Sequence, residues 1–517
     1  GGTYHDNGDM GIYISSSGTI TGVEAYNNTD EGIYFYNGWV STENRWGVIS
    51  NNTIYGNGDN GLYVDSTATV ASGLSVLVSD NTVYDNYRRG MYLYAGGPSG
   101  DWFGLVASGN SVTQSTNSNS NEALYAYNVL VTGNEITGGD EHGVVAYDRS
   151  VVRGNVIHES DGRGVYAEHS AQIIGNRIWG HAGSGIESRS SSSAIGNLVY
   201  GNLIGIHAVS SPANISNNVV YGNTDVGIRI DGDSNSGMVI ANNTVHQSTG
   251  RAIDVMGSTQ NLVLRNNILV VDGGHGIYVD DNSQIGFDSN YNLFEMAGGA
   301  LAGYWQGDQV AVSDWQSASI QDANSIEGDP QFVSPAGADG VMGVLDGVDY
   351  GEDDDFHVQS GSIAIDHGDL DWWWIGEPGS NGNRVNIGAY GNTNEATQSD
   401  AQVIQVLTPN GGERYELGVP ASITWLTAGL GLWDPLALIN AGNGGNAGNR
   451  WLADAYYDQY QNTSSTSTAI DLGGVSDAAP EAVYQTWRYS SNLGTLSYVL
   501  PVADGSYHVR LHWAELY

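Results

Sequence analysis

The sequence predicts an all-β solenoid, in which short parallel strands stack coil upon coil. Three observations support this prediction. A motif recurs thirteen times at steps of 21 to 29 residues, and a period of that length is typical of solenoids. Each repeat holds short runs that alternate apolar and polar side chains, with Gly, Asn and Asp between them. No run with helical periodicity is long enough to form a helix.

The repeating motif is an asparagine, a short apolar pair and then a Gly-Ile-x-Val step. It reads NNTIYGNGDNGLYV at Asn51 to Val64 and NNVVYGNTDVGIRI at Asn217 to Ile230. Stacked coils bury columns of Ile, Val and Leu, and they place the asparagines in one row where neighbours hydrogen-bond. The expected members of this row are Asn52, Asn81, Asn110, Asn134, Asn155, Asn176, Asn197, Asn218, Asn243, Asn267 and Asn290.

These repeats resemble the right-handed parallel β-helix family, which includes pectate lyases, polygalacturonases and alginate-modifying enzymes. The resemblance covers residues 1–299. It implies a right-handed parallel β-helix solenoid of about 12 to 13 coils. It also implies that the exposed strand face engages a polysaccharide, with uronic-acid polymers among the expected substrates.

Residues 300–398 are expected to close the solenoid. After Asn292 the repeat fades, and three blocks follow: GDPQFV at Gly328 to Val333, DDFHVQSGSIAIDHGD at Asp354 to Asp369 and NIGAYG at Asn386 to Gly391. They are similar to the segment that closes many secreted β-helix proteins, which implies a C-terminal cap. A cap is needed because an open solenoid end exposes strand edges and apolar core.

Two further modules follow the closing segment. Within residues 399–434, the stretch VIQVLTPNGGERYELGVPASITW resembles the opening of an immunoglobulin-like module, which is incomplete because a sandwich needs roughly 100 residues. Residues 435–517 resemble the first part of a malectin-type carbohydrate-binding domain, through INAGNGG, YQTWRYS and the final AELY. This resemblance implies a partial β-sandwich that stacks sugar rings on Tyr489 and Tyr517.

Composition narrows the class of protein. The chain has no cysteine, so neither disulfides nor thiolate metal sites stabilise it. Its 57 acidic residues face 16 basic ones, all of them arginine, and the formal net charge is -41. Such a surface repels nucleic acid and anionic membranes, and no apolar stretch is long enough to predict a membrane span. We therefore expect a secreted or cell-surface protein of bacterial type that is monomeric.

The sequence assigns no firm cofactor and no residue as a metal ligand. Clustered carboxylates at Asp346 to Asp355 suit Ca²⁺, although solvated acidic loops also explain them. The chain begins at Gly1 within a repeat and shows no signal peptide, so we expect a fragment or a processed form.

The candidate functional residues are those that point out of the coils. In the Gly-Ile-x-Val-x step the apolar residues point inward, so the third and fifth positions point outward. The third-position residues are Tyr13, Tyr34, Tyr63, Tyr92, Tyr125, Val145, Tyr166, Glu187, His207, Arg229, Asp254 and Tyr278. The fifth-position residues are Ser15, Tyr36, Asp65, Tyr94, Tyr127, Tyr147, Glu168, Arg189, Val209, Asp231, Met256 and Asp280. Tyrosines gather on the early coils and charges on the later ones.

Adjacent coils lie about 4.8 Å apart, so charged outward residues are expected to form exposed rows. The members of one row are Glu187, His207, Arg229 and Asp254, and those of the next are Glu168, Arg189 and Asp231. As diagonal neighbours, Asp231 and Asp254 come out roughly 8 Å apart, within the range of inverting glycosidases. Eight of the sixteen arginines fall within residues 149–265, and an arginine fork suits a uronate carboxylate.

One catalytic hypothesis is β-elimination or C5-epimerisation of a uronide. Arg189 or Arg229 neutralises the carboxylate of the substrate. His207 removes the neighbouring proton, and Tyr166 acts as the acid. Glu187, next to His207 on the predicted row, completes this candidate catalytic group.

Two alternatives stay open. In a glycoside hydrolase, Asp231 and Asp254 serve as acid and base. In a noncatalytic carbohydrate-binding surface or adhesion protein, the charges pair across strands, which stabilises a sheet by about 0.2 to 1 kcal/mol per pair, and exposed tyrosines stack on sugars. The expected substrate-binding residues on the solenoid are Tyr63, Tyr92, Tyr94, Tyr125, Tyr127, Tyr147, Arg163 and Glu168.

Overall fold

The computed structural model describes residues 1–38, 46–67, 74–96, 103–114, 122–210, 214–232, 237–379 and 381–399, and six short strands beyond residue 400. The chain divides into two compact units, Gly1–Phe356 and His357–Tyr517. In the described ranges, no helix combines the length and the apolar character that a membrane span requires.

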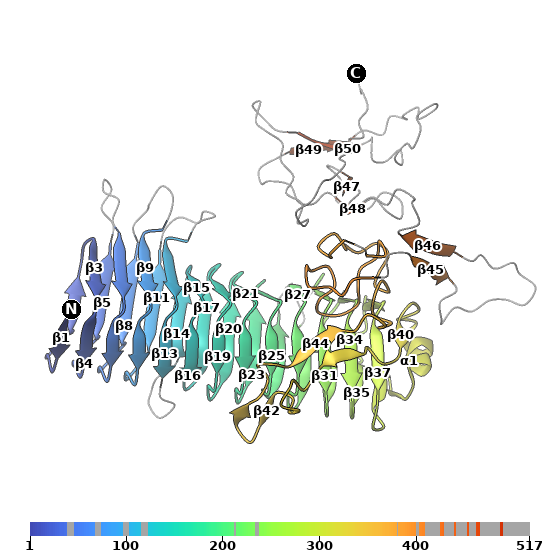
Figure 1. Ribbon diagram of the computed structural model, residues 1–517, viewed down its shortest axis with the longest axis horizontal. Coiled ribbons are helices and arrows are strands. Elements are labelled where there is room, and N and C mark those ends of the chain that lie inside the picture. The colour runs from blue at the N-terminus through green and yellow to red at the C-terminus, as the bar shows by residue number, and fades with distance from the viewer. Residues whose placement is uncertain are drawn as a thin grey trace, which may run out of the picture. The chain divides into compact units, whose positions relative to one another are not determined.

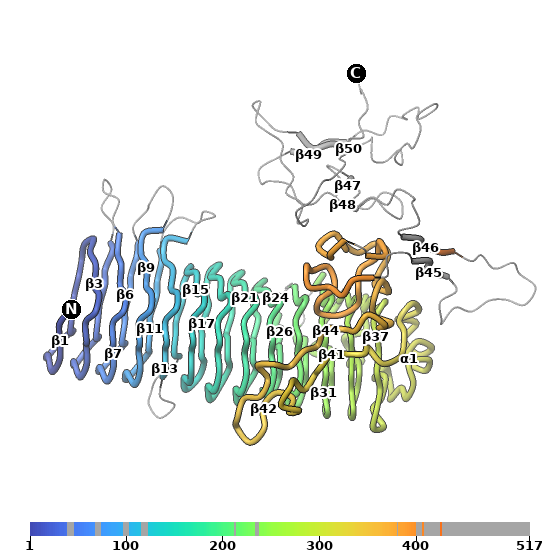
Figure 2. Tube along the Cα trace, viewed as in Figure 1, coloured from blue at the N-terminus to red at the C-terminus, as the bar shows by residue number. Residues whose placement is uncertain are grey.

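The first unit is a parallel β-solenoid, which confirms the predicted fold class (Figure 1). Its described strands form three sheets, here called A, B and C, of 14, 14 and 12 strands. Strand numbers advance by three along each sheet, apart from the final antiparallel pair β38 and β39 in sheet B, so each coil adds one strand to a sheet. The tube in Figure 2 shows the coils stacked side by side along the solenoid axis.

The strand bounds follow the repeat. Sheet A contains β1 (Gly2–His5), β4 (Val23–Tyr26), β7 (Thr53–Tyr55), β10 (Thr82–Tyr84), β13 (Ser111–Gln114), β16 (Glu135–Gly138), β19 (Val156–His158), β22 (Arg177–Trp179), β25 (Leu198–Tyr200), β28 (Val219–Tyr221), β31 (Thr244–Gln247), β34 (Ile268–Val271), β37 (Leu293–Met296) and β40 (Ile326–Glu327). Sheet B contains β2 (Ile12–Ile14), β5 (Ile33–Asn37), β8 (Leu62–Ser66), β11 (Met91–Ala95), β14 (Glu122–Tyr127), β17 (His142–Tyr147), β20 (Arg163–Glu168), β23 (Ser184–Arg189), β26 (Ile204–Val209), β29 (Val226–Asp231), β32 (Arg251–Met256), β35 (His275–Val279), β38 (Leu301–Tyr304) and the antiparallel β39 (Asp308–Gln309). Sheet C contains β3 (Gly18–Thr21), β6 (Gly47–Ser50), β9 (Val76–Ser79), β12 (Leu105–Ser108), β15 (Leu130–Thr132), β18 (Val151–Arg153), β21 (Gln172–Ile174), β24 (Ser193–Ile195), β27 (Asn214–Ser216), β30 (Val239–Ala241), β33 (Val263–Arg265) and β36 (Asp288–Asn290).

The remaining elements are short. They are α1 (Val312–Ser319), β41 (Phe332–Ser334), β42 (Val344–Leu345), β43 (Val348–Asp349), β44 (Asp355–Val358), β45 (Val403–Thr408), β46 (Thr424–Ala428), β47 (Ile439–Asn440), β48 (Leu452–Ala453), β49 (Asn462–Ser465) and β50 (Thr486–Tyr489).

The core lies inside the coils, where the alternating pattern places it. In β20, Val165 and Ala167 point inward and are fully buried. Burial of one such branched aliphatic side chain contributes about 1.5 to 3 kcal/mol, and every coil repeats it. Most coils have a glycine before the first inward residue of the step, and Ala123 and Ala252 take its place in β14 and β32. Close packing favours this small residue, because a Cβ on Gly185 would lie 2.9 Å from the carbonyl oxygen of Gly205 on the next coil.

The asparagine row is confirmed from Asn52 to Asn267, and its members are almost fully buried. Asn155 is typical, because its Oδ1 accepts from the backbone N–H and the side-chain amide of Asn134, each at 2.9 Å. Its own amide donates to Asn176 Oδ1 and to a backbone carbonyl. The predicted last member, Asn290, is wrong: Asn267 donates to Asn292 instead, because Asn290 still belongs to β36.

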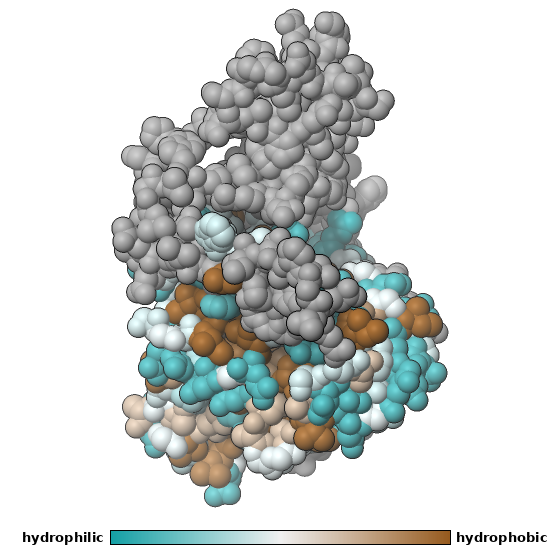
Figure 3. Space-filling view, turned by 90° about the vertical axis from the view of Figure 1, so that its right-hand side faces the viewer, coloured by the Kyte–Doolittle hydropathy of each residue, from teal (hydrophilic) through white to brown (hydrophobic). Residues whose placement is uncertain are grey.

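The segment after the last coil packs against the solenoid in two places within the first unit. The helix α1 packs on β38 through Trp315, which is fully buried and donates its indole N–H to Asp322 at 2.8 Å. Figure 3 looks at this end of the solenoid and shows apolar and polar residues mixed on its surface. Residues 343–356 then run back over sheet A, where Asp349 binds Arg177 at 2.5 Å and Tyr200 at 2.7 Å.

Candidate functional site

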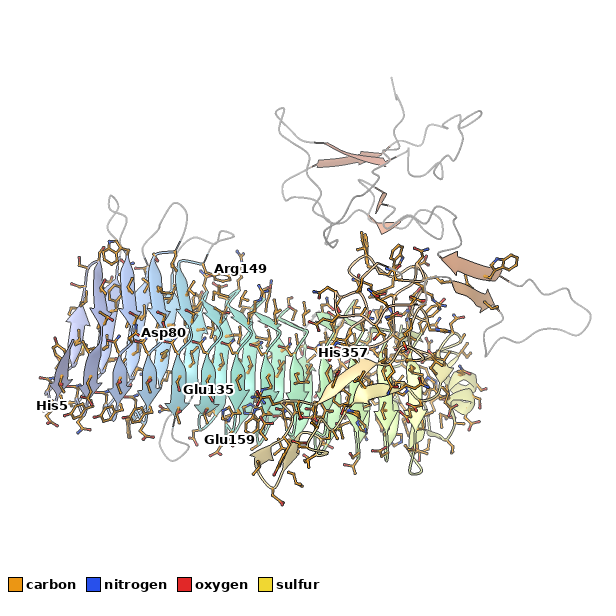
Figure 4. All side chains as sticks on the ribbon, viewed as in Figure 1. His5, Asp80, Glu135, Arg149, Glu159 and His357 are labelled. Carbon is orange, nitrogen blue, oxygen red and sulfur yellow. The ribbon has the colours of Figure 1, made fainter. Side chains whose placement is uncertain are left out.

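The outward side chains of sheet B form three rows. In β20 the first, fourth and sixth residues, Arg163, Tyr166 and Glu168, point outward and are half-buried, while Val165 and Ala167 point inward. The fourth and sixth residues of such strands are the third and fifth positions of the repeat. The first residue, which precedes the glycine, forms a further row that the sequence analysis did not read. Figure 4 shows how the rows of side chains repeat along the solenoid.

The strand register brings the charged candidates together. Tyr166 lies beside Glu187, and Glu187 lies beside His207. Arg229 follows His207, and Asp254 follows Arg229. Five neighbouring strands, β20 to β32, therefore place five of the predicted catalytic residues on one continuous row, while Arg189 and Asp231 lie on the neighbouring row.

The first centre on this row is the Glu187 cluster, which consists of Arg163, Glu187 and Arg189. Arg163 Nε donates to Glu187 Oε2, and Arg189 Nε donates to Glu187 Oε1 at 2.7 Å. Burial raises the pKa of Glu187, but His207, Arg189 and Arg163 outweigh burial and lower the pKa to about 2. The carboxylate is therefore ionised at neutral pH and fixes both guanidinium groups.

The second centre is the Asp254 cluster, which consists of Arg229, Asp254 and Arg251. Arg229 Nε donates to Asp254 Oδ2 at 2.9 Å, and Arg251 Nη1 donates to Oδ1 at 2.8 Å. Arg229 also binds Asp225 at 3.1 Å, and the Arg251 guanidinium lies over the Tyr278 ring at 3.6 Å. All three charges are thus already engaged within the protein.

The prediction that this row is exposed is wrong for its two acids. The Glu187 side chain is 2% exposed and the Asp254 side chain is fully buried. The physical reason is the reach of arginine, because guanidinium groups from neighbouring positions fold over each carboxylate. The side-chain carboxylate of Asp231, the diagonal neighbour of Asp254, has no hydrogen-bond partner among the described residues.

His207 lies between the two clusters. Its Nδ1 is 3.7 Å from Glu187 Oε2, and its side chain is 18% exposed. Its Nε2 is buried and has no hydrogen-bond partner in the part of the chain that the structure describes. One ring nitrogen is therefore oriented by a carboxylate, while the other keeps its hydrogen-bonding capacity.

Tyr166 links the Glu187 cluster to the tyrosine coils. Its hydroxyl donates to Glu168 Oε2 at 2.9 Å, and the guanidinium carbons of Arg163 and Arg189 lie 5.8 and 5.7 Å from its ring centre. Burial, followed by the hydrogen bond to Glu168, raises the pKa of Tyr166. The phenol therefore holds its proton over the neutral range.

The tyrosines of sheet B stack on one another. The Tyr92 ring is 4.6 Å from Tyr63 and 4.7 Å from Tyr125, with interplanar angles of 15° and 1°. Tyr94 and Tyr127 stack at 4.7 Å, and Tyr147 is tilted against Tyr125 at 5.8 Å. A ring face that touches the next ring is not available to a sugar. The stacks therefore present mainly ring edges and hydroxyl groups outward, unlike the flat platforms that the sequence suggested.

The row that precedes the glycines holds one residue that the sequence predicted, Arg163, and several that it did not. It contains Arg89 and Glu122, which pair at 2.5 Å, and His142, which stacks on Tyr166. Arg251 belongs to the same row. Strand alternation could not have found this row, because Arg163 lies three places before the outward Tyr166 and the two residues between them are both buried.

Acidic groups meet in two other places. Within the stretch proposed for Ca²⁺, Asp349 binds Arg177, and carboxylates of Asp353 and Asp354 accept from backbone N–H groups. A different group, Asp30, Glu31 and Asp59, brings its carboxylates within 4.8 Å of one another. Burial, with the nearby aspartates, raises the pKa of Glu31 to about 7. Ca²⁺ binding stays a prediction.

The malectin-like residues are only partly described. Tyr489 ends β50, which pairs with β49, but its side chain and Tyr517 lie outside the described residues. The predicted sugar contacts of these two tyrosines stay predictions.

Different parts of the chain match different families of known proteins. Residues 436–517 match the malectin domain family, whose members bind carbohydrate. The A-module of the Azotobacter vinelandii mannuronan C-5 epimerase AlgE4 is 15% identical, with a TM-score of 0.37 over 56% of this chain and 88% of that one. The pectate lyase Pel9A is 12% identical, with a TM-score of 0.30 over 77% and 88%. No curated protein sequence matches the chain.

The first unit has a clear family match. The model described as "Right handed beta helix region" matches residues 1–118, 40–204 and 172–315. Together these overlapping matches span more than half of the 517 residues. The chain therefore belongs to the right-handed β-helix family.

Proposed function

We propose that this chain binds a uronate-containing polysaccharide along sheet B, outside the cell, with the Glu187 cluster as the central subsite. The observation that carries the proposal is the way Glu187 holds two arginines. It uses the Nε atoms of Arg163 and Arg189, and their terminal nitrogens have no hydrogen-bond partner among the described residues. Two oriented guanidinium forks are suited to the carboxylate of a sugar acid.

Local charge supports the same proposal. Two arginines and one carboxylate leave the Glu187 cluster with a formal charge of +1, although the whole chain carries -41. The Asp254 cluster is neutral once Asp225 is counted, so it offers no comparable site. The two guanidinium groups of the Glu187 cluster therefore offer a polyanionic chain local positive charge on a face of an otherwise acidic protein.

The binding proposal is tested with polygalacturonate and alginate in affinity gel electrophoresis. Replacing Arg163 and Arg189 by glutamine should weaken retention of both polymers by about tenfold or more, because charged hydrogen bonds contribute about 1.5 to 3 kcal/mol each. Arg149→Gln/Arg153→Gln is the matched control, since it also removes two positive charges, from exposed side chains outside the cluster. If the cluster and control variants weakened binding equally, net charge alone would explain the attraction, and the proposed subsite would be refuted.

A second candidate function is β-elimination or C5-epimerisation on the same polymer. The specific observation is His207, whose Nε2 lacks a partner while Nδ1 faces Glu187. An imidazole oriented in this way fits a general base, and Tyr166, which keeps its proton, fits the acid. The hydrolase alternative is less supported, because Asp254 has both oxygens engaged by arginines.

His207→Ala separates binding from catalysis. If the chain is a lyase or epimerase, the variant should lose formation of unsaturated uronides, followed by ultraviolet absorbance, or exchange of the C5 proton, followed by NMR. It should keep its retention on polygalacturonate, because the arginines remain. An active His207→Ala variant would refute the assigned base.

A further inference from the structure

The second unit contains a loop that none of the functions above uses. The described residues 369–379 and 381–384, here called the tryptophan loop, include three consecutive tryptophans at positions 372–374. The base of the loop is closed, because Gly368 N–H donates to Val385 O at 2.9 Å. A compact loop of this size with its ends together is frequently functional.

The scaffold of the tryptophan loop is built from buried polar groups. Arg384 is 1% exposed, and its guanidinium donates to the carbonyls of Gly368 and His367. Glu377 is 6% exposed, and it accepts from the N–H groups of Asn386 and Asn392 at 2.8 Å each. Such contacts fix the backbone of the loop in place.

The tryptophans sit between two turns of this scaffold. Trp372 N–H donates to Asp369 O at 3.0 Å, and Glu377 N–H donates to Trp374 O at 3.0 Å. All three indole side chains are nevertheless only half-buried. Trp372 and Trp374 show no hydrogen bond and no ring contact from their side chains among the described residues. A rigid backbone that leaves large aromatic groups partly in water is typical of a preformed binding surface.

Unsatisfied polar atoms accompany the aromatic groups. Glu377 Oε2, Asn381 Nδ2 and Asn383 Nδ2 are buried, and none of them has a partner in the described part of the chain. A buried group without a partner costs about 1 to 3 kcal/mol, so three within one loop call for a ligand that supplies hydroxyl groups.

We propose that the tryptophan loop is a second glycan-binding site, which takes uncharged sugar units. Indole rings stack on the apolar faces of sugars, and the carboxylates of Asp369 and Asp371 accept from hydroxyl groups. The loop has one described cation, Arg384, and it is buried against carbonyls. A uronate, a nucleic acid or an anionic lipid therefore finds no counter-charge here, which distinguishes this site from the Glu187 cluster.

The test uses the full chain and affinity gel electrophoresis against galactomannan, xyloglucan, xylan and mixed-linkage glucan, with polygalacturonate alongside. One or more of the neutral polymers should retain the unmodified chain. The double variant Trp372→Ala/Trp374→Ala should bind that polymer about tenfold more weakly, since each aromatic contact contributes about 0.5 to 1.5 kcal/mol. Its polygalacturonate retention should not change. The double glutamine variant of Arg163 and Arg189 should bind polygalacturonate more weakly and keep its retention by the neutral polymer. Either proposal can therefore fail while the other holds.

Two controls keep the proposal falsifiable. Tyr489→Ala tests the malectin-like region; if it alone abolishes neutral-glycan retention, the tryptophan loop is not the site. Hydroxyl-radical footprinting of the unmodified chain should show Trp372 and Trp374 protected by the neutral polymer, which needs no variant to fold. Absence of retention on every neutral polymer, or protection by phosphatidylcholine vesicles in place of glycans, would overturn the proposal.

Discussion

Two buried glutamates in different units show how one residue type is accommodated in opposite ways. Glu187, in the solenoid, is surrounded by Arg163, Arg189 and His207, which lower its pKa to about 2 in spite of burial. Among the described residues, Glu377 in the second unit has no cation as a partner and accepts from the backbone N–H groups of Asn386 and Asn392. Burial therefore prevails and raises the pKa of Glu377 to about 8.

The two carboxyl groups stabilise their surroundings in different ways. Glu187 is a permanent anion that orients two guanidinium groups toward the surface, so its charge is part of the proposed subsite. Glu377 is uncharged over most of the neutral range and serves as a hydrogen-bond acceptor inside a loop. A buried acid can thus hold its neighbours either as an anion or as an uncharged hydrogen-bond acceptor. The two cases differ in how local stability depends on pH.

Glu187→Gln should have the largest effect on stability. The change keeps the size and one acceptor oxygen but leaves Arg163 and Arg189 without an anion. We expect the local stability of the solenoid to fall by about 2 to 3 kcal/mol at pH 7, below the range for fully buried pairs because both arginines are partly exposed. Hydrogen exchange of peptides from β20 to β26 measures this loss.

Glu135→Gln is the control for that experiment, because its side chain is 66% exposed on sheet A. A change within about 0.5 kcal/mol is expected there. If both variants behave alike, Glu187 does not hold its arginines in the way the contacts indicate.

Acid provides the second test. The folded pKa of Glu187 lies below the ordinary value of 4.5, so its stabilisation is fully present above that value and is lost as pH falls toward 2. The gap between the unmodified chain and Glu187→Gln should therefore shrink from its neutral value to near zero between about pH 4.5 and pH 2. Hydrogen exchange at matched pH values follows it, and a gap that stays constant would contradict the lowered pKa.

Glu377→Gln tests whether Glu377 is uncharged in the folded protein. The folded pKa of Glu377 is raised from 4.5 to about 8, so its stabilisation is fully present below pH 4.5 and is lost as pH rises through 8. Glutamine keeps an acceptor and does not titrate. Relative to the unmodified chain, the variant should gain about 1 kcal/mol or more in local stability above pH 8 and lose that advantage in acid. Peptides that cover the tryptophan loop report the difference, and destabilisation at high pH would show that Glu377 works as an anion.

The solenoid could be predicted from sequence because its signals are local. Strand alternation and the repeating asparagine each depend on a few neighbouring residues. The asparagine row was misread only at its end. In earlier coils the residue before the asparagine is Asn, Asp or Gly, which tolerate positive φ, whereas Tyr291 takes φ 57° before Asn292 and hides the turn.

The site could be predicted only as far as rows of residues. Alternation places Glu187 beside His207, and the structure agrees. It does not say which cation binds Glu187, because long arginine side chains reach diagonal as well as direct neighbours. Arg163 belongs to the row that lies outside the repeating motif. The fold of the tryptophan loop depends on contacts such as that between Gly368 and Val385, which no sequence repeat predicts.

The smallest expected effect comes from taking one arginine away. Arg163→Gln leaves Arg189 and His207 beside Glu187, so the carboxylate keeps two of its three partners. Because the Arg163 side chain is 36% exposed, we expect a loss of about 0.5 to 1 kcal/mol in local stability at pH 7. The pKa of Glu187 should rise with it, so the acid-induced loss should begin at higher pH than in the unmodified chain. Hydrogen exchange of the β23 peptide, measured from pH 7 downward, checks both effects. A loss as large as that of Glu187→Gln would mean that Arg163 alone neutralises the buried carboxylate, and that the cluster presents one guanidinium fork in place of two.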